Sequence, residues 1–127
     1  MIGCVLRVSG TNFDVEAFLD DSPLDPCAVW HRGEIRSNGQ LPADSSGLTL
    51  EVSDGDLAEQ IVGAVIFLRN NSDEVCRLTS CLGVEAHLDF GIDRRDVFVQ
   101  TDYFPPELIR LAGSLGLGIE LSQYPVA

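Results

Sequence analysis

The sequence predicts one α+β domain over residues 1–127, with a mainly antiparallel sheet and helices packed on one face of it. Several short segments alternate apolar and polar residues with a period of two, as half-buried strands do. Other segments place apolar residues three and four apart, as amphipathic helices do. A chain of 127 residues that is 45% hydrophobic is long enough for one core and too short for two.

The first third of the chain predicts strand, helix, strand and loop in that order. Residues 2–8 alternate, with Cys4 on the apolar side, and predict a strand with one deeply buried face. Asn12 or Asp14 is placed to cap a short helix. Residues 27–35 predict a second strand, and the polar, glycine-containing segment 36–47 predicts a loop.

The middle of the chain predicts a strand and two helices. Residues 48–53 alternate and predict the third strand. Residues 53–56 are expected to cap a longer helix that runs through Leu68. Val62, Ile66 and Phe67 widen the apolar stripe of this helix, which predicts cover on more than one side. A short helix is expected over residues 72–83.

The last third carries the clearest strand pattern. Residues 84–92 alternate without interruption and predict a half-buried strand. A charged turn over 93–96 is expected to lead into a hairpin partner over 97–101. Prolines open a helix over 105–116, and a final strand includes residues 119–121. The predicted order begins β-α-β-β-α-β, as in ferredoxin-like domains, and is extended by β-α-β.

The charge balance bears on possible partners. Twenty acidic residues stand against eight basic ones, all of them Arg, for a net charge of −12. Nucleic acid and anionic membranes would repel such a chain, so neither is expected as a partner. The charge favours a basic protein partner, or it serves only to keep the surface soluble.

The chain is expected to work in the cytoplasm without a cofactor. It shows no signal-peptide pattern and no apolar run long enough to span a membrane. None of the four cysteines forms a C-x-x-C pair, so a zinc site is not expected. Reduced thiols are the rule in a cytosolic protein.

No catalytic set stands out, and His87 is the nearest candidate. The chain has no nucleophile elbow, phosphate loop or zinc-protease motif. His87 lies between Glu85 and Asp89 on the polar side of its predicted strand, so three titratable groups share one face. A metal or general-base role is one interpretation, and a solvated sheet face is the other.

The segment around the single tryptophan is the second candidate site. Trp30 brings a large ring and one N–H donor, Arg32 and Glu34 bring opposite charges, and Gly33 permits a bend or a close approach. The functional interpretation is a recognition site in which Trp30 and Arg32 contact an anionic or planar group. The structural interpretation is a core tryptophan beside a bulge in an edge strand.

These motifs, with others along the chain, resemble the bacterial domain of unknown function 4279 family. The resemblance is carried by residues 12–16 (Asn-Phe-Asp-Val-Glu), residues 30–34 (Trp-His-Arg-Gly-Glu), the helical motif over 107–116, and the strand 119–121 with Tyr124. It spans nearly the whole chain except the middle. It implies that residues 30–34 matter, without implying an activity.

Three functions follow as hypotheses. The first is a non-enzymatic protein-interaction module, immunity-like or regulatory, that binds a basic partner through its acidic surface. The second is a small-ligand-binding or enzymatic domain with a site near Trp30, Arg32 and His87. The third is a homodimer formed through an uncovered strand edge or sheet face.

Overall fold

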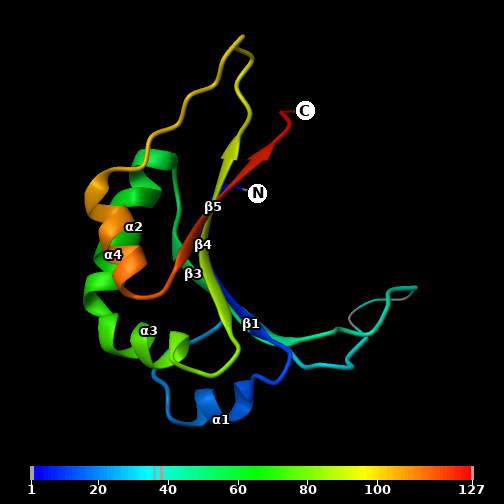
Figure 1. Ribbon diagram of the computed structural model, residues 1–127. Helices are drawn as coiled ribbons and strands as arrows, with labels where there is room; N and C mark the ends of the chain where they lie inside the picture. Colours follow the sequence, from blue (N-terminus) through cyan, green and yellow to red (C-terminus); the bar gives the residue numbers. More distant parts are fainter. Residues whose placement is uncertain (1, 36, 38, 127) are drawn as a thin grey trace.

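The computed structural model describes residues 2–35, 37 and 39–126. All helices of this described part lie on one side of a single curved sheet (Figure 1). The elements in chain order are β1 (Gly3–Gly10), α1 (Val15–Asp20), β2 (Ala28–Trp30), β3 (Ser46–Ser53), α2 (Leu57–Asn70), α3 (Ser72–Thr79), β4 (Glu85–Asp93), α4 (Pro106–Ser114) and β5 (Gly118–Tyr124). The predicted α+β class with a mainly antiparallel sheet is confirmed.

The sheet is built around its first strand. The strand order is β2-β3-β1-β4-β5, and β1 pairs antiparallel with both β3 and β4. Strand β2 is antiparallel to β3, whereas β4 and β5 are parallel. Because Leu6 lies opposite Leu50 and Leu88, the three strands bury their leucines under the helices in one row. Cys4 is buried on this side, as predicted.

Local signals explain where the helices begin and end. The side chain of Asp14 accepts a hydrogen bond from the backbone N–H of Ala17 at 3.1 Å and caps α1. At α2, Asp56 and Glu59 form a reciprocal capping box. Helix α4 begins with Pro106 and is followed by Gly116, whose φ of +79° suits the end of a helix.

One face of α2 forms much of the core, and a second apolar stripe stays outside. Ala64 and Leu68 are fully buried against the sheet. The sheet and α4 cover α2 on different sides, as predicted, and Phe67 packs against the core, but Val62 and Ile66 stay 59% and 55% exposed. The sheet and α4 pack against other sides of the helix and leave this stripe uncovered.

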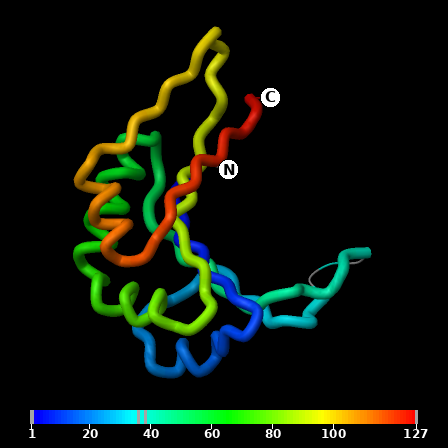
Figure 2. Tube along the Cα trace, viewed as in Figure 1, coloured from blue at the N-terminus to red at the C-terminus, as the bar shows by residue number. Residues whose placement is uncertain are grey.

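Two predicted strands are shorter or absent. Residues 97–101 do not form a strand, because β5 takes the place beside β4 and residues 94–103 project past the end of the sheet (Figures 1 and 2). The strand predicted over 27–35 is limited to β2, since a turn follows Trp30. The loop predicted over 36–47 ends at Ser46, where β3 begins, and its residues 36 and 38 lie outside the described residues.

The end of the sheet from which residues 94–103 project also holds the first residues of β1 and the last residues of β5. Gly3 at the start of β1 pairs with Gly91, and Tyr124 at the end of β5 pairs with Asp93. Both termini therefore lie at this end (Figure 2). In the described part of the chain, no helix is long and apolar enough to cross a membrane.

Candidate functional site

The face of the sheet opposite the helices is polar and uncovered, and we call it the open face. Strand register places alternate residues of four strands there. Its acidic and basic residues are Arg7, Glu51, Glu85, His87, Asp89, Asp93 and Glu120. The predicted row of Glu85, His87 and Asp89 thus shares one face, and β1 and β5 add charged groups on either side of it.

A buried carboxylate lies at the centre of the open face. The Asp89 side chain is only 7% exposed and forms an ion pair with Arg7 of the neighbouring strand. Its second oxygen accepts a hydrogen bond from the Ser122 hydroxyl at 2.6 Å. Both oxygens are therefore satisfied by neighbouring strands, and the arrangement ties β1, β4 and β5 together.

His87 pairs with an acid on β5 and not with the acids of its own strand. Its Nε2 lies 2.6 Å from Oε1 of Glu120, and its side chain is 29% exposed. Among residues 2–35, 37 and 39–126, no group of three His, Cys, Asp or Glu side chains is placed to hold a metal ion. The metal interpretation of this row therefore finds no ligand set in the described part of the chain.

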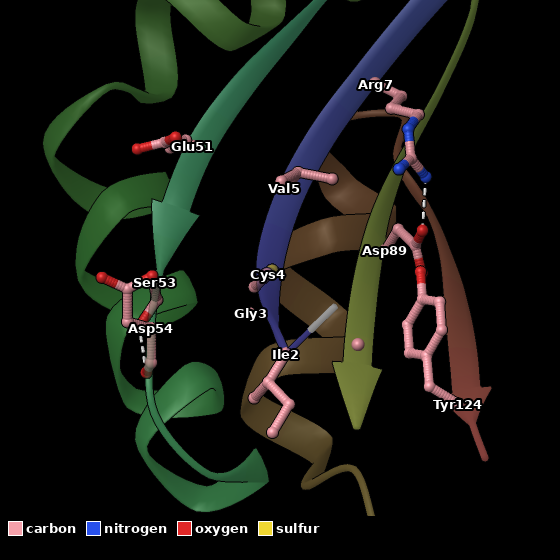
Figure 3. Close-up of a pocket in the computed structure, with 11 residues that line it drawn as sticks. Ile2, Gly3, Cys4, Val5, Arg7, Glu51, Ser53, Asp54, Asp89 and Tyr124 are labelled. Carbon is pink, nitrogen blue, oxygen red and sulfur yellow. Dashed lines mark hydrogen bonds and ion pairs between the residues drawn. The ribbon is translucent and has the colours of Figure 1, made fainter. Parts of the chain in front are cut away.

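Two facing glycines leave a small cavity next to Asp89. Gly3 and Gly91 lie opposite each other and carry no side chains, so a space of about 150 Å³ opens on the sheet. The Tyr124 ring points along β5 toward Asp89 on one side of it, and Glu51, Ser53 and Asp54 line the other (Figure 3). A space of this size suits a group about as large as benzene.

The nearest thiol to this cavity is unreactive by position. Burial raises the pKa of Cys4 to about 12, and the negative charge of Asp89 adds to the effect. The side chain is 1% exposed and belongs to the core. Cys4 therefore stays protonated at neutral pH and behaves as a small hydrophobe.

Trp30 lies on the open face, where a glycine on the neighbouring strand leaves room for its ring. It pairs with Gly47 of β3, and a Cβ built on Gly47 would lie 2.4 Å from Cζ2 of the indole. The same Cβ would lie 2.4 Å from the carbonyl oxygen of Val8. Gly47 is thus a notch into which the indole fits.

Arg32, Gly33 and Glu34 form a tight turn directly after Trp30. The N–H of Glu34 donates to the carbonyl of His31 at 3.0 Å, and Gly33 has a φ of +87°, as the third position of a type II turn requires. The Glu34 carboxylate accepts from the backbone N–H of His31 at 2.8 Å. The Nη1 group of Arg32 donates to Oδ1 of Asn12 at 3.5 Å.

Sequence reasoning missed His31, which lies between two carboxylates. Its Nε2 lies 2.7 Å from Glu16 of α1, and its Nδ1 lies 3.5 Å from Glu34. The hydrogen bond with Glu16 is the main cause that raises the pKa of His31 above its ordinary value, and Glu34 adds to it. The spacing His-x-x-Glu within the turn was visible in the sequence, but the partner from α1 was not.

The predicted site residues fall into two groups. Trp30, Arg32, Gly33 and Glu34 lie together at the β2 edge, and His87 lies on β4. Trp30 and His87 share the open face but are separated by three strand spacings, roughly 14 Å. The cavity beside Asp89 is lined by residues from neither group.

No family model, curated protein or solved structure matches the chain. The resemblance to the domain of unknown function 4279 family therefore stays a prediction.

Proposed function

We propose that the protein is a non-enzymatic interaction module, immunity-like or regulatory, that binds a basic protein partner on the open face. One observation carries the proposal: an uncovered sheet face presents five acidic residues against one Arg and one His. Helices cover the other face completely enough to bury its apolar row, so the open face is the broad surface left for a partner.

The charges on this face are largely uncompensated. Arg7 forms an ion pair with Asp89, and His87 lies next to Glu120. Within the described part of the chain, Glu51, Glu85 and Asp93 form no ion pair. Such a surface attracts a basic partner at long range and repels other acidic proteins, which supports selectivity and fast association.

The setting proposed for this interaction is the bacterial cytoplasm. The four cysteines are free thiols, which agrees with a reducing compartment. A net charge of −12 suits a protein that must stay soluble until it meets a partner of opposite charge.

The test compares two variants that have the same net charge. One carries Glu51→Gln, Glu85→Gln and Glu120→Gln on the open face. The other carries Asp20→Asn, Asp25→Asn and Asp73→Asn, all exposed positions outside the sheet. Each variant loses three negative charges from −12 and so carries −9.

Binding of a short polylysine peptide is measured by calorimetry at two salt concentrations. The open-face variant is expected to bind about tenfold more weakly than the natural chain, while the matched variant changes little. NMR shifts caused by the peptide should fall on β1, β4 and β5. Equal loss in both variants would mean that net charge alone governs binding and would refute an open-face site.

A second candidate is a small-ligand-binding or enzymatic domain. The original hypothesis put its site near Trp30, Arg32 and His87, and the observation that favours a ligand is the cavity beside Asp89. A screen of metabolites by thermal shift tests this candidate, because a bound ligand raises the unfolding temperature. Replacing Gly91 by Leu should abolish any such shift by filling the cavity.

We also propose that the first four strands form a ferredoxin-like unit, which α4 and β5 extend. The support is the order β2-β3-β1-β4 with antiparallel pairing at each step. A structural match with members of that fold class would test this assignment.

A further inference from the structure

The segment after β4 forms a projecting finger with an apolar tip. This finger, residues 94–103, extends past the end of the sheet (Figure 1). At its tip, Val97 and Val99 are 52% and 71% exposed, and Phe98 is fully exposed. Three neighbouring apolar side chains held in water by a loop mark a contact surface more often than a random exposure.

Side-chain hydrogen bonds and a ring contact hold the finger in shape. The Asp102 side chain at its base is 7% exposed and accepts hydrogen bonds from Arg95 at 3.2 Å and from Gln100 at 3.0 Å. Gln100 in turn accepts from the backbone N–H of Arg95 at 2.9 Å. Phe104 anchors the return of the chain against Phe90 in the core, with ring centroids 5.2 Å apart. These contacts join the two sides of the finger and hold its tip away from the body.

A groove of complementary character lies at the same end of the molecule. It is lined by Ser53, Asp54, Ala58, Glu59, Val62 and Gly63, between the end of β3 and the first turns of α2. Val62 and, one turn further, Ile66 form the uncovered stripe of α2. The β3 end that borders the groove lies at the same end of the sheet as the β4 end that leads into the finger.

One ion pair can form between the finger of one copy and the groove of another. The side chain of Arg94 forms no ion pair with any described residue, and Arg94 is one of only eight basic residues in the chain. Asp54 at the rim of the groove likewise lacks an ion-pair partner in the described part. The finger does not occupy the groove of its own chain, because Phe98 is fully exposed.

We propose that two copies of this chain form a symmetric dimer in which the finger of each copy inserts Phe98 into the α2 groove of the other. In a two-fold arrangement of two copies joined at this end, the contact between finger and groove is made twice, once by each copy's finger. Two Phe rings and the surfaces they cover bury about 800 Å². Val97 and Val99 of both copies bring the contact to about the 1,000 Å² that a specific interface needs.

Sedimentation equilibrium over a range of concentrations tests the dimer directly. The natural chain is expected to show a monomer–dimer equilibrium, and Phe98→Ser is expected to weaken it by at least about tenfold. Leu82→Ser is the matched control, because Leu82 is 96% exposed but lies in the turn between α3 and β4, far from both the finger and the groove. A monomeric natural chain, or equal effects of both substitutions, would overturn the proposal.

Cross-linking then tests which surfaces meet. In a background with Cys27, Cys76 and Cys81 replaced by Ser, a mixture of Phe98→Cys and Val62→Cys chains should form a disulfide between the two different chains. Each variant alone should stay uncrosslinked. Cross-links between two Phe98→Cys chains, with none between the two different chains, would place fingers against each other and overturn the finger-in-groove arrangement.

The dimer and the open-face function can fail separately. Polylysine binding should be unchanged in Phe98→Ser, because the finger lies outside the open face. The dimer contact rests mainly on apolar burial, so it should persist at salt concentrations that remove the peptide. A dimer that dissociates with the same salt dependence as the peptide would contradict this origin.

Discussion

Replacing Gly47 by Ala tests how closely Trp30 is fitted to the sheet. The new Cβ would lie 2.4 Å from the Val8 carbonyl oxygen and 2.4 Å from the indole, about 1 Å short of an ordinary contact on both sides. The indole can swing away, but the oxygen belongs to β1, which is paired on both edges. Overpacking of this kind costs up to about 3 kcal/mol, and we expect Gly47→Ala to lower the free energy of unfolding by about that amount.

Urea unfolding followed by circular dichroism measures this loss as a lower midpoint at an unchanged slope. Gly113→Ala is the matched control, since a Cβ at this helical position meets nothing within 4 Å. It is expected to stabilise the protein by up to about 1 kcal/mol through helix propensity.

The contribution of the indole can be separated from that of the backbone. In a Trp30→Ala background, the cost of Gly47→Ala should fall to about 2 kcal/mol, because only the clash with Val8 remains. A Gly47→Ala variant with an unchanged midpoint would refute the notch. A cost that vanishes without the indole would show that β1 gives way, contrary to its central place.

Three further predictions follow from the polar groups and the buried thiol. Arg7→Met should cost about 2 kcal/mol in urea unfolding, at the low end because Arg7 is half exposed, and Asp89→Leu in the same chain should restore part of it. Because the pKa of His31 is raised, its contact with Glu16 stabilises the fold fully below pH 6.5, and this stabilisation is lost as the pH rises through the raised pKa. Glu16→Gln should therefore make the imidazole titrate at a lower pH, as followed by NMR. An unchanged titration would contradict the contact. With a pKa of about 12, Cys4 should resist a thiol reagent at mildly alkaline pH until the protein unfolds, whereas rapid labelling of the native protein at Cys4 would show that the strand opens.

Local patterns in the sequence were sufficient for the elements and their buried faces. Alternation predicted β1 and β4, and the capping residues of α1 and α2 were found because an N-cap acts within one helical turn. The positive φ of Gly33 also has a local cause, the turn that follows Trp30. In these places the deciding interaction lies within a few residues.

The errors arose where distant segments decide the outcome. The alternating pattern of residues 97–101 suits a strand, but β5 already occupies the free edge of β4. The predicted cover of α2 on more than one side is present, but the apolar pattern alone did not show that Val62 and Ile66 would stay exposed. For the same reason, no local signal linked Arg7 with Asp89, which are 82 residues apart in the chain.

The central place of β1 has a consequence for how the chain acquires its shape during synthesis. Val5 of β1 pairs with Glu51 on one side and with Asp89 on the other. During synthesis, the apolar strand β1 therefore leaves the ribosome well before either of its neighbours has been made. The core can form only after most of the chain has emerged. During that interval, long-range repulsion between acidic nascent chains slows the pairing of exposed strands, before the finger and the groove of the folded chain have formed.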